Sequence, residues 1–170
     1  RYVESTMMYR DEKPGELGGL TRVRAITVDD GHIFCTTDQI KNEVKNIASI
    51  IEEFYSGLGM YGEHSVALSV RDPNNFDKYI GEEKDWDKAE KMLKELSDDL
   101  NLKAKRVEGE AALYGPKLDY VFKDSLGREW QLATIQIDFS MPKRFELTYK
   151  NKDGKDETPA MIHRAILGSY

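Results

Sequence analysis

The sequence predicts an α+β fold in which an antiparallel sheet is flanked by helices. Helical patterns occur singly among runs of neighbouring strand patterns, which is the order that α+β domains show. The first two strand patterns are joined by a stretch rich in glycine, which is typical of a hairpin. We find no internal repeat, low-complexity stretch or linker, so the chain is expected to be one domain.

The N-terminal third predicts a hairpin followed by a helix. Residues 3–12 and 20–30 are expected to be its strands, with KPGELGG as the turn. Thr36 and Gln39 form a capping box, which marks a helix start, and the helix is expected to end at Gly57 and Gly59. Its apolar positions at helical spacing are Ile40, Val44, Ile47, Ala48, Ile51, Phe54 and Leu58.

The remaining elements follow from the same two periodicities. Val66, Leu68 and Val70 alternate with small residues and predict a half-buried strand that ends at RDPNN. A second amphipathic helix is expected after Asp85. Its apolar face consists of Trp86, Ala89, Leu93, Leu96 and Leu100. Further strands are expected at 118–124, 130–139 and 145–149.

Composition excludes several classes of protein. Of the 170 residues, 39% are apolar and 33% are charged, which rules out a disordered chain, and no apolar run approaches the roughly 18 residues of a membrane span. The single cysteine, Cys35, cannot form an intramolecular disulfide, so we expect a cytoplasmic protein. The net charge of −6 argues against this surface alone holding a nucleic-acid backbone.

The predicted hairpin collects six polar side chains on one face by strand alternation. They are Arg10, Glu12, Arg22, Arg24, Asp30 and His32. Guanidinium groups bind phosphate and carboxylate oxygens in pairs, so this face suits a nucleoside triphosphate. A solvated face with cross-strand ion pairs is the alternative that the pattern leaves open.

Four runs of residues carry a family resemblance. MMYRDEKPGELGGLTRVRAITVDDGHIFC resembles motif 2 of the class II aminoacyl-tRNA synthetases, in the form found in threonyl-tRNA synthetases. EGEAALYGPKLDY, GREWQLATIQIDFSMPKRFELTY and PAMIHRAILGS resemble the rest of that catalytic domain, in the same order. The resemblance implies that residues 1–170 are part of the catalytic domain, from motif 2 to the start of motif 3, without a second domain. The chain is expected to have been cut from a longer protein.

The resemblance implies roles in ATP binding and catalysis. Arg10 would contact the α-phosphate and the threonine carboxylate, Glu12 the adenine amino group, and Arg22 the γ-phosphate; these three are the expected catalytic residues. Lys117 and Gln131 would also reach the nucleotide, and Ile26 would lie under the adenine, with simple core packing as its alternative. Mg²⁺ is expected to accompany ATP.

The resemblance also implies a threonine site with zinc. His32 and His163 match the family's two histidine ligands, while its third ligand, a cysteine, is absent from this chain. Asp30 matches the aspartate that accepts a hydrogen bond from the threonine hydroxyl. The other expected threonine-binding residues are Arg10, Tyr114, Gln136 and Ser169.

Three further residues differ from this pattern. Cys35 lies three residues from His32 and would face the other way on a strand, so we expect a small buried hydrophobe and no ligand. His64 matches no motif and is expected at the surface. Val28 stands where bacterial members usually carry glutamine, which removes an amide near the substrate carboxylate.

The function implied is therefore that of a threonine–tRNA ligase fragment. It would belong to an enzyme that joins threonine to AMP, passes it to tRNA(Thr), and works as a homodimer, with little or no activity in the isolated fragment. Contacts to the tRNA would come mainly from regions outside this chain. The alternative is a non-catalytic paralogue that binds ATP or an amino acid, and a Glu-Arg-Phe continuation after Tyr170 would argue against it.

Overall fold

The computed structural model describes residues 1–19 and 22–168. Its strands are β1 (Tyr2–Tyr9), β2 (Ala25–Cys35), β3 (His64–Val70), β4 (Lys105–Glu108), β5 (Lys117–Lys123), β6 (Glu129–Asp138), β7 (Tyr149–Lys150), β8 (Asp156–Glu157) and β9 (Ala160–Ala165). Its α-helices are α1 (Ile40–Gly57), α2 (Glu83–Asp99) and α3 (Ser140–Arg144), and short 3₁₀ turns occupy Thr37–Gln39, Tyr61–Glu63 and Phe76–Lys78. In the described part of the chain, no helix combines the length and apolar character needed to cross a membrane.

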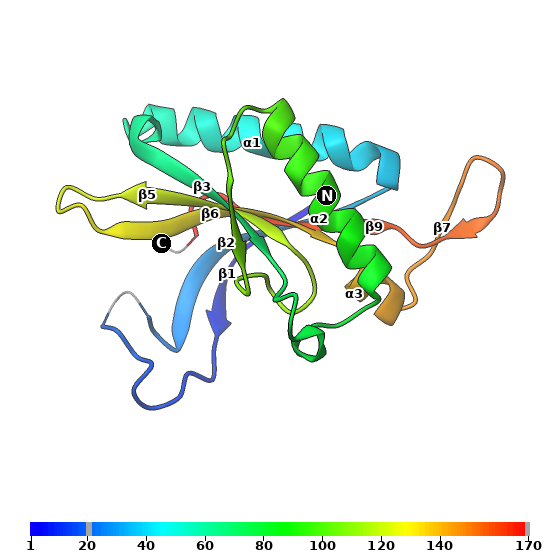
Figure 1. Ribbon diagram of the computed structural model, residues 1–170, viewed down its shortest axis with the longest axis horizontal. Helices are drawn as coiled ribbons and strands as arrows, with labels where there is room; N and C mark the ends of the chain where they lie inside the picture. Colours follow the sequence, from blue (N-terminus) through cyan, green and yellow to red (C-terminus); the bar gives the residue numbers. More distant parts are fainter. Residues whose placement is uncertain (20–21, 169–170) are drawn as a thin grey trace.

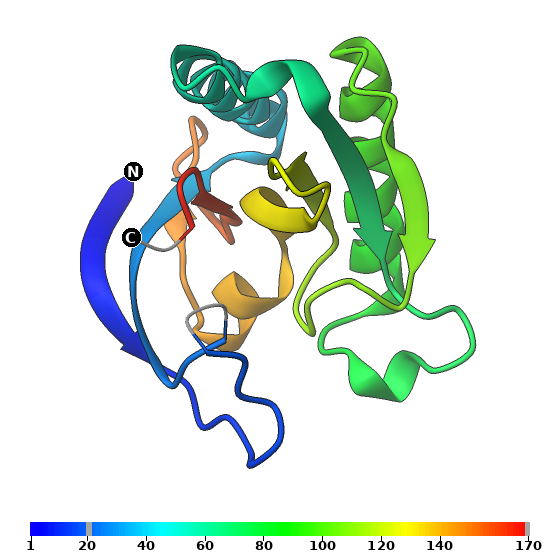
Figure 2. The ribbon, with the colours of Figure 1, turned by 90° about the vertical axis from the view of Figure 1, so that its left-hand side faces the viewer.

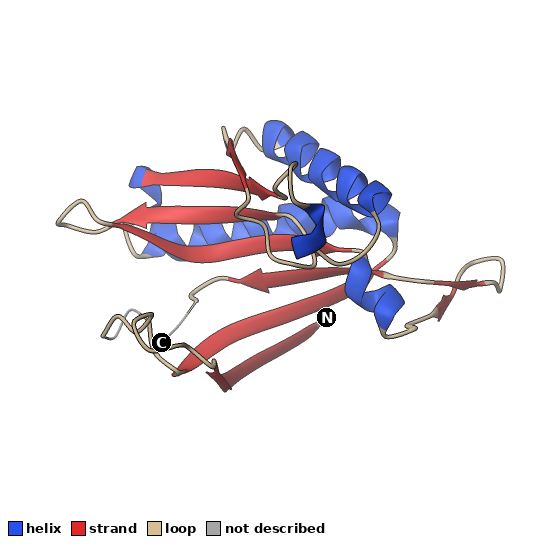
Figure 3. Cartoon of the chain, turned by 60° about the horizontal axis from the view of Figure 1, so that its bottom comes forward, coloured by secondary structure: helices blue, strands red, loops and turns tan. Residues whose placement is uncertain are grey.

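Within the described residues, the main sheet has seven strands in the order β1-β2-β9-β6-β5-β3-β4, and β7 pairs with β8 in a separate ribbon. The strands are drawn in red in Figure 3. The described pairs of the main sheet are antiparallel except for β3 and β4, which run parallel. The expected α+β class is confirmed, with a sheet that is mixed at one edge. Strand β9 lies between β2 and β6, so residues near 30, 135 and 163 become neighbours.

The two faces of the sheet differ in character because successive side chains point to opposite sides. Helices α1 and α2 lie on one face of the sheet (Figure 1). Apolar side chains of that face, such as Ile33, Ile135 and Ile162, form one hydrophobic core with the buried sides of these helices. On the other face, the alternate residues of β2, β6 and β9 are a mixture of polar side chains, such as His32 and Gln136, and apolar ones, such as Val28 and Met161. The hydrophobic effect therefore fixes one face as core and leaves the other available for binding.

Several predicted elements are confirmed. The capping box of Thr36 and Gln39 is present, and α1 ends at Gly57. The strand through Val66 and the later strands β5 and β6 lie within two residues of their expected bounds, and the second helix begins at Glu83, two residues before Asp85. These segments have strong periodicity, so local pattern and tertiary packing agree.

Other elements differ from the prediction. Residues 145–149 do not form a strand: α3 ends at Arg144, and only Tyr149 enters the short strand β7. Strands β4 and β9 and helix α3 were not predicted. The segment KRVE is short and charged, and AMIHRA lacks a regular alternation, so each becomes a strand only because a neighbouring strand supplies its hydrogen bonds.

The N-terminal hairpin has a longer loop than expected, because β1 ends earlier and β2 begins later than predicted. Strand β1 ends at Tyr9 and β2 begins at Ala25, while a hydrogen bond from the Arg10 amide to the Arg24 carbonyl closes the ladder. Residues 10–19 and 22–24 therefore belong to a long loop that extends away from the sheet and is drawn in blue in Figure 2. Gly15 has a φ of +93°, a left-handed conformation that suits glycine in such a turn.

Candidate functional site

An open cleft of about 1430 Å³ covers the face of the sheet opposite to helices α1 and α2. Among the sequence-predicted site residues, eight line it: Arg10, Ile26, Asp30, His32, Tyr114, Gln131, Gln136 and His163. They come from the end of the hairpin, the cleft-facing positions of β2, β6 and β9, and the loop before β5. The sheet thus gathers residues that are up to 153 positions apart in the sequence, from Arg10 to His163.

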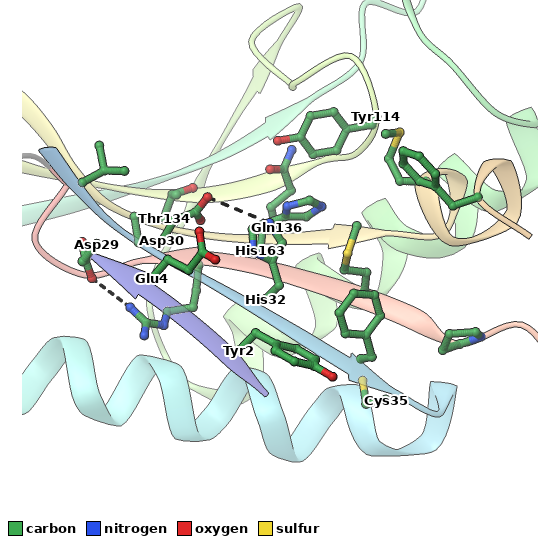
Figure 4. A pocket seen from close by; sticks show the side chains of 18 of the residues that line it. Tyr2, Glu4, Asp29, Asp30, His32, Cys35, Tyr114, Thr134, Gln136 and His163 are labelled. Carbon is green, nitrogen blue, oxygen red and sulfur yellow. Dashed lines mark hydrogen bonds and ion pairs between the residues drawn. The ribbon is translucent and has the colours of Figure 1, made fainter. Parts of the chain in front are cut away.

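The half of the cleft toward the end of β2, which we call the histidine end, contains two histidines (Figure 4). His32 and His163 are partners across β2 and β9, and their ring centroids lie 4.8 Å apart. Asp30 Oδ2 is 4.0 Å from His32 Nε2. His163 Nε2 hydrogen-bonds to Oδ2 of the fully buried Asp138 at 2.9 Å. The Tyr114 ring lies 4.7 Å from the His163 ring and closes this end.

Tyr114 and Gln136 present defined polar groups at the histidine end. Burial, followed by the nearby Asp138 and Asp30 carboxylates, raises the pKa of the Tyr114 phenol, which stays protonated and can donate a hydrogen bond. Gln136 Nε2 donates to the Gly115 carbonyl at 3.0 Å, so its amide oxygen is the end available to a ligand. This end can bind both donors and acceptors of a small polar molecule.

The opposite end of the cleft contains Arg10, Ile26 and Gln131. Ile26 lies six residues before His32 on β2, a separation of about 20 Å along a strand. Gln131 precedes Gln136 on β6, which runs in the same direction as β2 because β9 is antiparallel to both. The two strands therefore place the arginine end and the histidine end in opposite halves of one cleft.

Glu12 and Arg22 do not line the cleft. The Arg22 guanidinium donates to Glu12 Oε2 from Nε at 3.1 Å and Nη2 at 3.0 Å, and Arg24 Nε donates to the Glu12 carbonyl. The hydrogen bonds from Arg22 lower the pKa of the Glu12 carboxyl, and those to Glu12 raise the pKa of Arg22. The prediction that all six hairpin groups share one wall is wrong, because Glu12, Arg22 and Arg24 lie in the loop beyond the strands.

Lys117 and Ser169 are the other two predicted site residues, and they do not belong to the described lining of the cleft. Lys117 lies on β5 beside the cleft without lining it, and its Nζ pairs with the buried carboxylate of Asp119. Ser169 lies outside the described residues. The roles assigned to all of these residues in ATP, threonine or metal binding remain predictions.

Two predictions about single residues can be compared with the structure. Cys35 is a buried member of the core, as expected, and burial, followed by Glu43 and Asp38, raises the pKa of its thiol to about 11. His64 is not a free surface residue. Its ring lies 4.1 Å from the Tyr61 ring and 5.9 Å from Tyr120, and its Nδ1 hydrogen-bonds to the Tyr61 carbonyl.

The donor atoms for zinc amount to two imidazoles. Within residues 1–19 and 22–168, no group of three or more His, Cys, Asp or Glu side chains is placed to hold a metal ion. Cys35 belongs to the hydrophobic core and lies three positions from His32 on β2, so the two side chains point to opposite faces of the sheet. His32 and His163 therefore fit part of a zinc site, and the residues of this chain do not complete it.

Sequence reasoning missed three acidic residues that organise the cleft. Asp138 forms a hydrogen bond with His163. Asp119 accepts hydrogen bonds from Gln131 and Thr134, and Asp29 accepts them from the backbone after β9. Asp119 and Asp138 each interrupt an apolar strand, which is the signal that could have identified them. A buried carboxylate needs several donors, so each marks a place where side chains converge.

Comparison with known proteins gives a consistent family. Residues 1–170 match the model of the class II tRNA synthetase core domain (G, H, P, S and T). The threonine–tRNA ligase of Gloeobacter violaceus is 50% identical over 99% of this chain and 27% of that protein. The threonine–tRNA ligase of Thermus thermophilus is 48% identical over 99% of this chain and 25% of that protein.

A solved structure agrees with these relatives. The crystal structure titled as the RNA binding domain of threonyl-tRNA synthetase from Cryptosporidium parvum Iowa II has a TM-score of 0.88 and 39% sequence identity. The match covers 98% of this chain and 41% of that chain. The present chain thus spans about a quarter of the length of the curated relatives that it matches.

Proposed function

The chain belongs to the class II tRNA synthetase core domain family, and we propose that it is the part of a threonine–tRNA ligase that binds threonine and ATP. The observation that carries this proposal is the cleft, which joins an arginine end to a histidine end on one face of the sheet. The names of its relatives, threonine–tRNA ligases at about half identity over nearly the whole chain, support the choice of amino acid.

The proposed reaction begins with formation of an adenylate. A threonine carboxylate oxygen attacks the α-phosphorus of ATP, the bond from that phosphorus to the oxygen bridging to the β-phosphate breaks, and pyrophosphate leaves. Both reactants are anionic, so the site must provide fixed positive charge as the transition state forms. Arg10 lines the cleft and would supply this charge, whereas Arg164, which also lines it, is paired with Asp29. No side-chain nucleophile is needed.

The two ends of the cleft suggest where the reactants lie. ATP would occupy the arginine end, with its base over Ile26 and its polar groups near Gln131. Threonine would occupy the histidine end, within reach of Asp30, Tyr114 and Gln136. Glu12, Arg22 and Lys117 would join the nucleotide only after exchanging their present partners, because Glu12 and Arg22 bind each other and Lys117 binds Asp119.

Zinc and magnesium are proposed as cofactors. His32 and His163 would be ligands of a zinc ion whose third protein ligand comes from outside this chain, and the ion would select an amino acid that has a hydroxyl next to its amino group. Asp138 would orient His163, as partners of metal-binding imidazoles do. Mg²⁺ would accompany the ATP phosphates.

The later steps are also proposals. Threonine would pass to the terminal ribose of tRNA(Thr), with AMP as the leaving group. The net charge of −6 favours tRNA contacts outside this chain. A homodimer in the cytoplasm is proposed for the whole enzyme.

The test is threonine-dependent exchange of radioactive pyrophosphate into ATP by the full-length protein, with serine and valine as competing amino acids. Exchange that depends on threonine and exceeds that with serine or valine is expected. Absence of exchange with every amino acid would favour the second candidate, a non-catalytic paralogue. The feature that favours this second candidate is Val28, an apolar residue that lines the cleft between Ile26 and Asp30.

A further inference from the structure

Asp119 is a buried carboxylate on β5 that receives hydrogen bonds from four side chains. Its Oδ2 accepts from Ser69 Oγ at 2.6 Å and from Lys117 Nζ. Its Oδ1 accepts from Gln131 Nε2 at 2.6 Å and from Thr134 Oγ1 at 3.0 Å. Asp119 is only 4% exposed, so these donors replace its solvation shell. The carboxylate therefore joins side chains from the three strands β3, β5 and β6.

A β-bulge brings Gln131 into this group. Asp119 pairs with Thr134 and Tyr120 with Ala133, but Val121 pairs with Gln131, so Leu132 is the extra residue on β6. Without the bulge, Gln131 and Thr134 would face opposite sides of the sheet because they are three positions apart. With it, both bond to the same Asp119 oxygen and both line the cleft.

These hydrogen bonds determine which polar atoms of Gln131 and Thr134 can bind a ligand in the cleft. A carboxylate accepts hydrogen bonds and does not donate them, so Gln131 must turn its NH₂ group toward Asp119 and Thr134 must direct its hydroxyl hydrogen there. The Gln131 amide oxygen and the Thr134 hydroxyl lone pairs are then the groups available to a ligand. Lys117 supplies the opposite charge that a buried carboxylate needs.

We propose that Asp119 is a positioning residue for the nucleotide: it fixes Gln131, at the arginine end of the cleft, and Thr134, level with Asp30, as hydrogen-bond acceptors for the hydroxyl or amino donors of ATP. This inference rests on the proposed function. Asp119 does not touch the ligand and acts through the two residues that line the cleft.

The direct test is Asp119→Asn in the full-length protein, followed by threonine-dependent pyrophosphate exchange. The amide keeps the size of the carboxylate but faces its neighbours with an NH₂ group, so Gln131 loses its single preferred orientation. We expect the KM for ATP to rise about tenfold, while the KM for threonine changes less than about threefold. Asp119→Glu retains the carboxylate and should restore most of the ATP affinity.

A double-mutant cycle separates positioning from a general structural effect. In a Gln131→Leu background, Asp119→Asn should raise the KM for ATP by less than about threefold, because residues that act as a unit are not additive. The control is Glu90→Gln, which alters another buried carboxylate, bonded to Arg106 and outside the cleft. It should reduce thermal stability and leave the KM for ATP unchanged.

The outcomes are distinguishable. An unchanged KM for ATP in a folded Asp119→Asn protein, a rise only in the KM for threonine, or full additivity with Gln131→Leu would overturn the proposal. If Asp119→Asn did not fold, Ser69→Ala would remove one donor to Asp119 from outside the cleft. It should then raise the KM for ATP about threefold, and no change would count against the proposal. If the unaltered protein showed no threonine-dependent exchange, the proposed function itself would fail.

Discussion

Arg10 provides cationic charge at the end of the cleft opposite the histidines, on the first residue after β1. A charge-assisted hydrogen bond to phosphate contributes about 1.5–3 kcal/mol, so Arg10→Ala should reduce pyrophosphate exchange at least about tenfold. Arg106→Ala is the matched control, because Arg106 lies on β4 at the far edge of the sheet and pairs with Glu90. Equal exchange rates for the Arg10 variant and the unaltered protein would remove Arg10 from the site.

Val28 tests how complete the amino-acid site is. It faces the cleft between Ile26 and Asp30, and its isopropyl group cannot donate a hydrogen bond to a carboxylate. Val28→Gln should tighten threonine binding about two- to tenfold, the value of one added hydrogen bond. Isothermal titration calorimetry on the full-length protein measures this, with Val28→Met as a control for side-chain length. Equal or weaker affinity would mean that another group already binds the carboxylate.

At the scale of elements, Asp29 joins β2 to the segment that follows β9. Its carboxylate accepts from Arg164 Nη1 at 2.8 Å and from three consecutive backbone amides, those of Ile166, Leu167 and Gly168, at 2.9–3.0 Å. Asp29→Asn should let these amides exchange with deuterium at least about tenfold faster, since charged acceptors bond more strongly than neutral ones. The bond to Arg164 is drawn in Figure 4.

The control for this experiment is the neighbouring carboxylate. Asp30 faces the cleft near His32 and makes none of these bonds to residues 166–168. Asp30→Asn should therefore leave the exchange rates there unchanged. If both variants gave the same rates as the unaltered protein, the segment would be held by backbone pairing alone.

The β5–β6 hairpin depends on the charge of Asp124. Its carboxylate accepts from Trp130 Nε1 at 3.0 Å and from the amides of Leu126 and Arg128 at 2.9 Å. The bond from Trp130, then those from Arg128 and Leu126, hold the pKa of the Asp124 carboxyl well below its ordinary value of 3.8. A lowered pKa in the folded state means that this stabilisation is complete above pH 3.8 and is lost as the pH falls toward the folded-state pKa.

Melting curves of Asp124→Asn should show this dependence. The variant should melt below the unaltered protein at pH 7, and the difference should shrink as the pH is lowered below about 4. Asp153→Asn, in the β7–β8 turn, is the control, because Asp153 contributes its backbone amide to that turn. A melting difference that is constant from pH 7 to pH 3 would contradict the role of the carboxylate charge.

At the scale of the whole molecule, the proposed zinc site would require residues from beyond this chain. His32 and His163 supply two nitrogen donors, and a zinc site in a protein normally has at least three protein ligands. The purified 170-residue chain should therefore contain well under one zinc per chain after dialysis, as measured by elemental analysis. A full equivalent of zinc that disappears in His163→Ala would show that Asp30 or Cys35 completes the site.

The sequence by itself determined the elements whose patterns are local and strong. The capping box before α1, the apolar face of α2 and the alternation in β3 and β6 each follow from the spacing of a few residues. Family resemblance identified Arg10, Asp30, His32 and His163, all of which line one cleft. Spacing of side chains is a property of the chain, so periodic segments and motifs are visible before folding.

Only the tertiary structure decided what depends on a neighbouring strand. Pairing with β2 and β6 makes residues 160–165 a strand, and the β-bulge turns Gln131 to the cleft face. The hairpin strands exclude Glu12 and Arg22, because β1 ends at Tyr9 and β2 begins at Ala25. Register and bulges are set by hydrogen bonds between segments distant in sequence, and a shift of one residue moves a side chain to the other face of the sheet. The alternation of residues within one strand therefore does not predict where a bulge or a register shift occurs.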